Sequence, residues 1–232
     1  MKTNAPTVIS AAEKRRFKDD HYEQLARVGK ALASPKRLEL LDLLAQGPRT
    51  VEALAEAAEL SLANASQHLQ VLRAARLVSS DKQGLYVTCT LAGPDVGALL
   101  VQLRGLATAR LAELEALHRD FLAAHGALEA VDRQELLRRA LAGEVTVLDV
   151  RPAEEYARGH LPGARSMPLG ELARRLHELP TDREIVAYCR GPACVFALDA
   201  VALLRASGLV AHRLDEGPPD WRARGLPLEG LA

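Results

Sequence analysis

The chain has 232 residues, a length that accommodates one or two domains of ordinary size. Its 30 Lys and Arg residues balance its 30 Asp and Glu residues, which excludes a polybasic nucleic-acid coat and an acidic tail protein. Aromatic residues make up 3% of the chain, too few for a platform that stacks the bases of single-stranded RNA. Any DNA binding must therefore come from a local surface.

The N-terminal residues 1–17 lack the apolar segment of a secretory signal, and no run of 18 or more apolar residues predicts a membrane span. Three cysteines are too few for a disulfide framework. We therefore expect a cytoplasmic protein without a cofactor, in which Cys89, Cys189 and Cys194 are free thiols.

The first 126 residues are typical of consecutive helices. One helix begins at Pro35 and stops at Gly47, a second follows Thr50 and ends near Ala58, and a third begins after Ser61. Ser and Thr are preferred at helix N-caps, and the connection between the second and third helices is short. The pattern predicts a helix-turn-helix.

Two β-rich runs, residues 77–80 and 85–91, flank a polar turn that contains Gly84. A hairpin directly after a helix-turn-helix is typical of a winged helix. Residues 95–125 then form one long amphipathic helix in this prediction, with an apolar stripe wide enough to serve as a dimer seam.

Residues 17–125 resemble the ArsR/SmtB family of winged-helix repressors, most specifically in LASPKRLELLDLL and LSLANASQHLQVLRAARLV. The resemblance implies a homodimer that binds double-stranded operator DNA, with half-sites about one helical turn apart.

The third helix is expected to carry the DNA-reading side chains. Ala65, Leu69 and Leu72 would face the core, and the opposite face would meet the major groove. Asn and Gln can pair with adenine there, whereas basic residues position the protein on phosphates, and a histidine on this face is expected to be structural or to meet a phosphate. The predicted DNA-contacting residues are Ala63, Asn64, Ser66, Gln67, His68, Gln70 and Arg73, with Lys82 in the wing.

Two departures from the family pattern matter. Glu59 stands where the family commonly has Gly in the turn, so a left-handed backbone there would be strained. The second helix begins without the cysteines that many relatives use for metal sensing, which argues against a metal site. A metal-responsive repressor stays as a third alternative, with these candidate ligands in the long helix: Asp95, Glu113, Glu115, His118 and His125.

After residue 126 the pattern changes to alternating strands and helices, with strands at 145–150 and 184–188 and helices at 171–179 and 193–207. This alternation predicts an α/β domain with a parallel sheet. The predicted organisation is a mainly α winged helix-turn-helix domain over residues 1–126 and an α/β domain over residues 127–232.

A short loop from Cys189 to Cys194 lies between a predicted strand and a predicted helix. Backbone amides and the helix N-terminus would stabilise a thiolate, so we expect the pKa of Cys189 to be lowered, with help from Arg190. A cysteine phosphatase would need an arginine six residues after the nucleophile, where this chain has Val195. Sulfur transfer is the remaining chemistry.

Four separated motifs, at residues 147–151, 159–164, 189–194 and 220–221, resemble a rhodanese domain over residues 128–230. The resemblance implies a persulfide on Cys189, held by the loop that Arg190, Gly191, Pro192, Ala193 and Cys194 complete. Its sulfur would come from thiosulfate, a polysulfide or a persulfide. Cys194 is either a core thiol or a resolving partner for the persulfide.

Two functional hypotheses follow. The first is a transcriptional regulator, a repressor by its resemblance, whose rhodanese domain senses or transfers sulfane sulfur. The alternative is a sulfurtransferase that uses its winged helix only for dimerisation or targeting. Rhodanese-type turnover is left open by the sequence.

Overall fold

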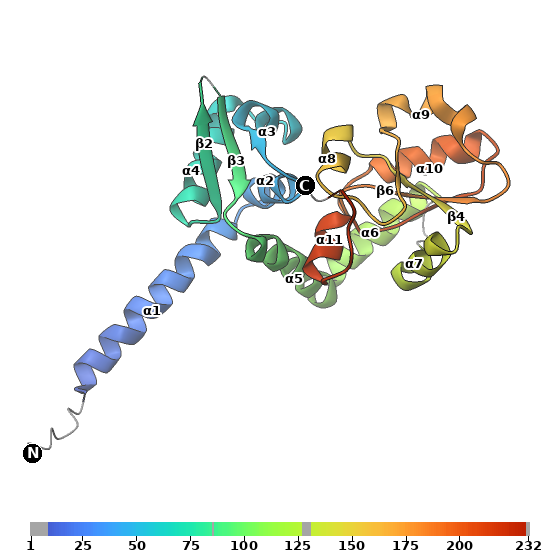
Figure 1. Ribbon diagram of the computed structural model, residues 1–232. Coiled ribbons are helices and arrows are strands. Elements are labelled where there is room, and N and C mark those ends of the chain that lie inside the picture. Colours follow the sequence, from blue (N-terminus) through green and yellow to red (C-terminus); the bar gives the residue numbers. More distant parts are fainter. Residues whose placement is uncertain (1–8, 85, 127–130, 231–232) are drawn as a thin grey trace, which may run out of the picture. The chain divides into compact units, whose positions relative to one another are not determined.

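The computed structural model describes residues 9–84, 86–126 and 131–230 (Figure 1). They divide into two compact units. The first contains the chain up to Leu41 together with Arg49–Ala92, and the second contains Asp42–Pro48 together with the chain from Gly93 onward.

The first unit is the predicted winged helix-turn-helix. Its three-stranded antiparallel sheet has the order β1-β3-β2. Thr50 and Ser61 cap α3 and α4 as expected, each accepting a hydrogen bond from a backbone amide three residues later. The elements are α1 (Ala11–Leu32), α2 (Pro35–Ala45), β1 (Arg49–Thr50), α3 (Val51–Ala57), α4 (Leu62–Ala74), β2 (Val78–Gln83) and β3 (Tyr86–Leu91). The residues of α2 from Asp42 onward are counted with the second unit.

Strand β1 was not predicted. It has two residues and pairs with β3 through Arg49 opposite Cys89 and Thr50 opposite Thr88. A strand of two residues is too short to show an alternation of polar and apolar residues in the sequence. Its register is set by its partner strand. The hairpin of β2 and β3 confirms the predicted wing.

The second unit contains a four-stranded sheet with the order β5-β4-β6-β7, in which all neighbouring strands are parallel. The predicted α/β domain with a parallel sheet is thereby confirmed. The elements are α5 (Pro94–Arg110), α6 (Ala112–Ala124), α7 (Arg133–Leu141), β4 (Val145–Asp149), α8 (Ala153–Ala157), β5 (Arg165–Ser166), α9 (Leu169–Arg175), a 3₁₀ turn (Leu176–Glu178), β6 (Glu184–Tyr188), α10 (Phe196–Ala206), β7 (Ala211–Arg213) and α11 (Pro218–Ala223).

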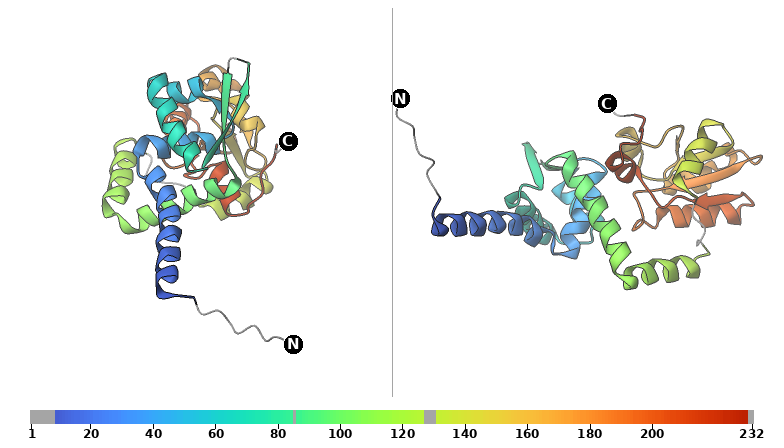
Figure 2. Two further views of the ribbon diagram at one scale, coloured as in Figure 1. Left: turned by 90° about the vertical axis from the view of Figure 1, so that its left-hand side faces the viewer. Right: turned by 90° about the horizontal axis from the view of Figure 1, so that it is seen from below.

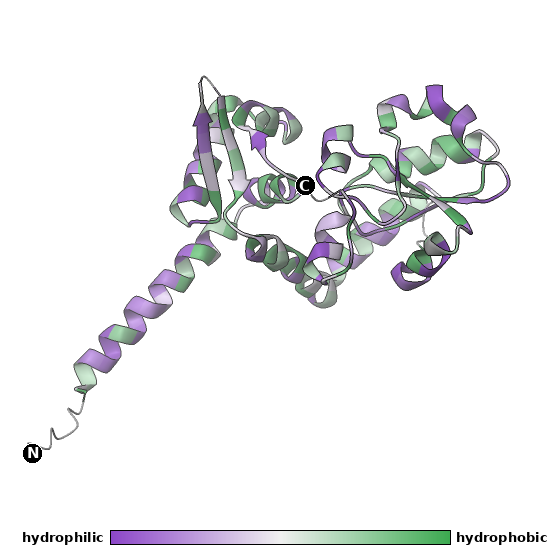
Figure 3. Ribbon diagram, viewed as in Figure 1, coloured by the Kyte–Doolittle hydropathy of each residue, from purple (hydrophilic) through white to green (hydrophobic). Residues whose placement is uncertain are grey.

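The parallel sheet is apolar on both faces, and Figure 3 shows hydrophobic residues along β4 and β6. Leu148 and Ile185 pack with residues of α9 and α10, whereas Val147 and Val186 pack with Leu136 and Trp221 on the other face. Alternating side chains of one strand thus fill two cores. The carboxyl ends of β4 and β6 meet at one edge of the sheet, where ligand sites of α/β folds lie.

The prediction of a single helix over residues 95–125 is wrong, because the helix is not continuous. It breaks at Leu111, whose backbone is extended (φ −109°, ψ 98°), and Figure 2 shows α5 and α6 meeting at an angle. No Pro or Gly lies at the break, so nothing in the local sequence marks it. Helix α5 packs against α11, and this tertiary contact is available only in the folded unit.

The helix expected from residue 193 begins later, at Phe196, so Cys194 lies in the loop before α10. Among the described helices, none is both long and apolar enough to cross a membrane.

Candidate functional site

Helix α4 presents the surface expected for DNA reading. Ala65, Leu69 and Leu72 are buried with at most 1% of their surface exposed, as predicted. The remaining predicted residues face outward to different degrees. Ala63, Asn64, Gln67, Gln70 and Lys82 are exposed, and Ser66, His68 and Arg73 are half-buried.

Arg73 links this helix to the wing. Its Nη1 donates a hydrogen bond to the Ser80 hydroxyl on β2 at 3.1 Å. The contact fixes the start of the hairpin relative to the exposed face of α4, and it uses one of several guanidinium donors.

The turn before α4 carries the strain expected at Glu59. Its φ is +51°, in the left-handed region. The amide of Leu60 donates to the Ala55 carbonyl, and the amide of Glu59 donates to the Glu56 carbonyl. These bonds end α3 in the manner that usually places Gly at this position.

The cysteine loop follows β6 directly. Cys189 is 2% exposed and belongs to the core cluster on one face of the sheet, whereas Cys194 is half-buried. The Cys189 thiol donates to the Cys194 carbonyl at 3.2 Å, and the Cys194 amide donates to the Gly191 carbonyl at 3.0 Å. The six-residue loop therefore brings both thiols into one site.

The pKa of Cys189 does not shift in the expected direction. The hydrogen bond with Cys194 and burial raise the pKa of Cys189 well above its usual value. The pKa of Cys194 is instead lowered to about 6, chiefly by the hydrogen bond with Cys189 and then by backbone hydrogen bonds at Arg190 and Phe196. Negative charges on two neighbouring thiols would repel each other, so the charge resides on the thiol that is less deeply buried.

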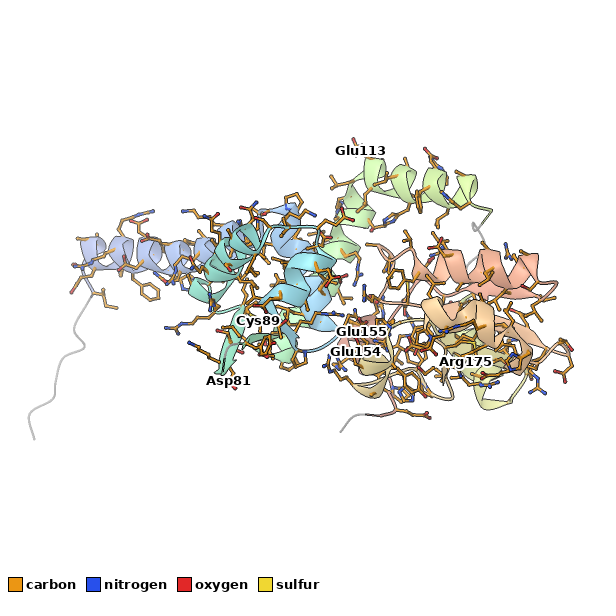
Figure 4. The ribbon with its side chains drawn as sticks, turned by 90° about the horizontal axis from the view of Figure 1, so that it is seen from above. Asp81, Cys89, Glu113, Glu154, Glu155 and Arg175 are labelled. Atoms are coloured by element: carbon orange, nitrogen blue, oxygen red, sulfur yellow. The ribbon has the colours of Figure 1, made fainter. Side chains whose placement is uncertain are left out.

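Arg190 interacts electrostatically with both thiols of the loop, but its main partner is a carboxylate. Its Nη2 lies 2.6 Å from Oε1 of Glu155, a fully buried carboxylate on α8 (Figure 4). The charge of Arg190 contributes to lowering the pKa of Cys194. The backbone at Gly217 packs tightly against the cysteine loop, because a Cβ there would lie 2.6 Å from the carbonyl oxygens of Cys189 and Arg190.

Asp149, Arg151 and Tyr188 form a buried support at the same edge of the sheet. Arg151 Nη2 lies 2.6 Å from Asp149 Oδ2, and the Tyr188 hydroxyl donates to the same oxygen at 2.5 Å. This network ties the ends of β4 and β6 together. The ring of His160 stacks on that of Tyr156, with centroids 3.7 Å apart, and this contact holds it in place.

A cavity of about 490 Å³ opens beside the loop within the second unit, lined by α5, α6 and residues 192–195. Cys194 lines it, and Cys189 does not. Arg104 also lines it, and its Nη2 lies 2.9 Å from Asp220 Oδ1. A Cβ added at Gly191 would lie 3.1 Å from Arg104 Nη1. Helix α5 therefore reaches the cysteine loop directly.

Sequence reasoning missed Arg104 and Arg213, both of which line this cavity. Arg104 is one polar residue on an amphipathic helix, and Arg213 ends a three-residue strand, so neither position carries a signal. Asp220 precedes Trp221 in a motif that was noted, and its ion pair with Arg104 depends on a residue 116 positions away.

The other candidate groups lie elsewhere. Cys89 is fully buried on β3 (Figure 4), and burial raises the pKa of its thiol. Of the candidate metal ligands, His118 lines the cavity and His125 Nδ1 lies 2.7 Å from the Phe121 carbonyl oxygen. Within residues 9–84, 86–126 and 131–230, no three His, Cys, Asp or Glu side chains gather as a metal site would require.

Comparison with known proteins matches the two units to two families. Residues 34–80 match the model of the arsR family of bacterial regulatory proteins. Residues 132–224 match the rhodanese-like domain.

A relative matches across both parts. An HTH-type transcriptional regulator of Mycobacterium tuberculosis is 49% identical over 207 residues, which cover 89% of this chain and 91% of the relative. A sulfurtransferase of Allochromatium vinosum is 32% identical over 99 residues, which cover 42% of this chain and 92% of that protein.

A solved structure is similar to the N-terminal part. The homodimeric winged helix-turn-helix DNA-binding domain of a possible ArsR-family regulator from Mycobacterium bovis is 44% identical, with a TM-score of 0.39, and the match covers 40% of this chain and 87% of that one.

Proposed function

Because the chain belongs to the family of ArsR-type HTH transcriptional regulators that carry a C-terminal rhodanese-like domain, we propose that it is a repressor controlled by sulfane sulfur. The observation that carries the proposal is the Cys189–Cys194 pair, in which one thiol holds a proton and the other faces a cavity as a thiolate. Operator binding belongs to the winged helix, and sulfur chemistry belongs to this pair.

On the DNA side, we assign base reading to Asn64, Gln67 and Gln70, whose amides are exposed on α4. Ala63 and Ser66 would complete the groove-facing set, and Arg73, His68 and Lys82 would meet phosphates. Large apolar side chains exposed on α1 and α5, among them Phe17 at 70% and Leu106 at 59%, support burial against a second copy.

On the sulfur side, the resemblance assigns the first persulfide to Cys189, but burial and charge favour Cys194. The Cys194 thiolate attacks the terminal sulfur of a polysulfide, the S–S bond breaks, and the shortened polysulfide anion leaves with the electron pair. Cys189 then attacks the inner sulfur of the Cys194 persulfide. A Cys189–Cys194 disulfide forms, and the outer sulfur leaves as hydrosulfide after the Cys189 proton is released.

Mass spectrometry of the full chain after polysulfide treatment tests this order. We expect wild type to lose two hydrogens through a Cys189–Cys194 cross-link, and Cys189→Ser to retain one added sulfur on Cys194. Cys89→Ser is the matched control and should behave as wild type. A persulfide on Cys189 that forms in Cys194→Ser at the wild-type rate would contradict the order, and no modification of either cysteine would contradict the sulfur chemistry itself.

The similarity to a sulfurtransferase favours one second function, catalytic sulfur transfer, in which the winged helix only dimerises or targets the chain. Repeated transfer from thiosulfate to cyanide would support it. Cross-link formation in a single turnover, without continued thiocyanate release, would support the regulator.

A further inference from the structure

Helix α2 begins in the first unit and ends in the second. Its residues 35–41 are counted with the first unit, whereas Asp42–Pro48, here called the α2 tail, are counted with the second. The match to the rhodanese-like domain starts only at residue 132. The second unit therefore contains a segment of the chain that this match does not include.

Gln46 joins the α2 tail to the cysteine loop. Its side chain is 5% exposed, and its Nε2 donates a hydrogen bond to the Arg190 carbonyl at 3.3 Å. Its Oε1 accepts a hydrogen bond from Nη1 of Arg151 at 3.1 Å. A buried amide is costly unless its donor and its acceptor are both satisfied, so these two bonds fix the side chain between the loop backbone and the Asp149–Arg151 pair.

Other residues of the α2 tail approach the same part of the second unit. A Cβ at Gly47 would lie 2.6 Å from Cδ of Arg158, so the backbone of the tail passes close to the end of α8. Asp42 is half-buried and interacts electrostatically with Arg104 and Arg190, and burial raises the pKa of its carboxyl group. The contact of Gln46 with the loop is thus one of several made by the tail.

The Arg190 carbonyl is the point at which the tail can act on the thiols. The amide of the same residue lowers the pKa of Cys194 through a backbone hydrogen bond. The carbonyl is held by Gln46 and by close packing against Gly217. Because both groups belong to one residue, holding its carbonyl also holds the direction of the amide that bonds Cys194.

The loop backbone must change when the two cysteines are joined. In the reduced protein the Cys189 thiol donates to the Cys194 carbonyl at 3.2 Å. Formation of the Cys189–Cys194 disulfide releases that proton, so this bond is lost. Arg190 lies between the two cysteines in the chain, and its carbonyl is therefore within the stretch that loses a restraint.

We propose that Gln46 is a positioning residue of the cysteine loop, and that the α2 tail is a route by which a change in the loop reaches α2. Gln46 acts through the backbone of Arg190. Its effect on the thiols requires only the reduced protein, whereas its effect on operator binding rests on the proposed function.

Alkylation of the reduced full chain by iodoacetamide across pH, measured by peptide mass spectrometry, tests the positioning role. Gln46→Met nearly keeps the size of the side chain and removes both hydrogen bonds. Its Cys194 midpoint should rise above the wild-type value near 6 by about one unit, the order expected when a hydrogen bond to a thiolate is weakened. Gln134→Met, exposed on α7, is the matched control and should keep the wild-type midpoint.

A second variant keeps the test decisive if Gln46→Met does not fold. Gln46→Glu retains an acceptor for Arg151 but has no donor for the Arg190 carbonyl, and its midpoint should rise at least as far because it also adds a negative charge. Buried Cys89 should stay unmodified in every folded variant. A wild-type midpoint in Gln46→Glu would overturn the inference. A wild-type midpoint in folded Gln46→Met would overturn it too, since a rise in Gln46→Glu alone would reflect only the added charge.

Operator binding tests the route through α2 separately. After complete reaction with polysulfide, Gln46→Met should contain the Cys189–Cys194 cross-link, and its change in operator affinity should be at least about threefold smaller than that of wild type. If wild type does not respond, the sulfur-controlled repressor is wrong, and the alkylation profile still decides the positioning role. If wild type and Gln46→Met respond equally, the route through α2 is wrong and the repressor stands.

Discussion

At the scale of single residues, the position of one proton decides the chemistry. Cys189 is the deeper sulfur and keeps its proton, whereas Cys194 lies at the cavity and carries the charge. The nucleophile of a thiol reaction is the thiolate, so reactivity follows the charge and not the position that a motif would assign. On the proposed mechanism, the pair would react first at Cys194 and be resolved by Cys189.

The pH dependence of alkylation follows from this assignment. The pKa of Cys194 is lowered to about 6, so acidification below that value protonates the thiolate and removes the nucleophile. The rate of Cys194 alkylation by iodoacetamide should therefore rise with pH through a midpoint near 6 and then level off. Peptide mass spectrometry measures each site, with buried Cys89 as the internal control. First alkylation at Cys189, or a midpoint at the ordinary thiol value of 9.0, would contradict the assignment.

Glu59 offers a stability test at the same scale. Its left-handed backbone costs a residue with a Cβ about 1 kcal/mol, and its side chain is exposed. Glu59→Gly should raise the free energy of unfolding by about 1 kcal/mol. Glu56→Gly, inside α3, is the matched control and should lower it by about as much, because its backbone is helical. Urea unfolding measures both, and a Glu59→Gly variant no more stable than wild type would refute the strain.

At the scale of elements, helix α5 is the helix that could transmit a change in the cysteine loop to the winged helix. It begins at Pro94, three residues after β3 of the wing ends at Leu91, and its Arg104 reaches Asp220 and the Gly191 backbone of the cysteine loop. A covalent change in the loop alters DNA binding only if it has different free energies in two states of such an element. The Arg104–Asp220 pair is the contact through which the loop would act on α5.

Removal of that contact should separate sulfur chemistry from DNA binding. Arg104→Met is expected to form the Cys189–Cys194 cross-link with polysulfide but to lose most of the change in operator affinity. Arg110→Met, exposed at the end of the same helix, is the matched control and should respond as wild type does. Mass spectrometry and fluorescence anisotropy on the same samples measure both. A full response in Arg104→Met would exclude this pair as the link.

The same scale shows what sequence can predict. Helices α3 and α4, the wing and strands β4 and β6 carry local signals in caps, turns and apolar runs, and all were predicted. The break at Leu111, strand β1 and the hydrogen bonds of Gln46 depend on partners distant in the chain, which no local pattern encodes. The motif located the cysteine loop, but the distribution of charge between its two thiols depends on burial.

At the scale of the whole molecule, an exact charge balance coexists with DNA binding. Residues 1–130 carry a formal net charge of about +1, so the DNA surface arises from the placement of a few basic residues and not from bulk charge. Relatively few phosphate contacts predict a shallow dependence of operator affinity on salt. Each copy would contribute its α4 and its wing to one half-site.

The proposed function joins operator binding and sulfur chemistry in one molecule, and one titration tests this link most directly. The full chain first selects its operator from a random duplex library, and fluorescence anisotropy then measures affinity before and after polysulfide treatment in wild type, Cys189→Ser and Cys194→Ser. Treatment should weaken wild-type binding by about tenfold or more and leave both variants unchanged. Equal affinity of treated and untreated wild type would contradict the proposed control of operator binding by sulfane sulfur.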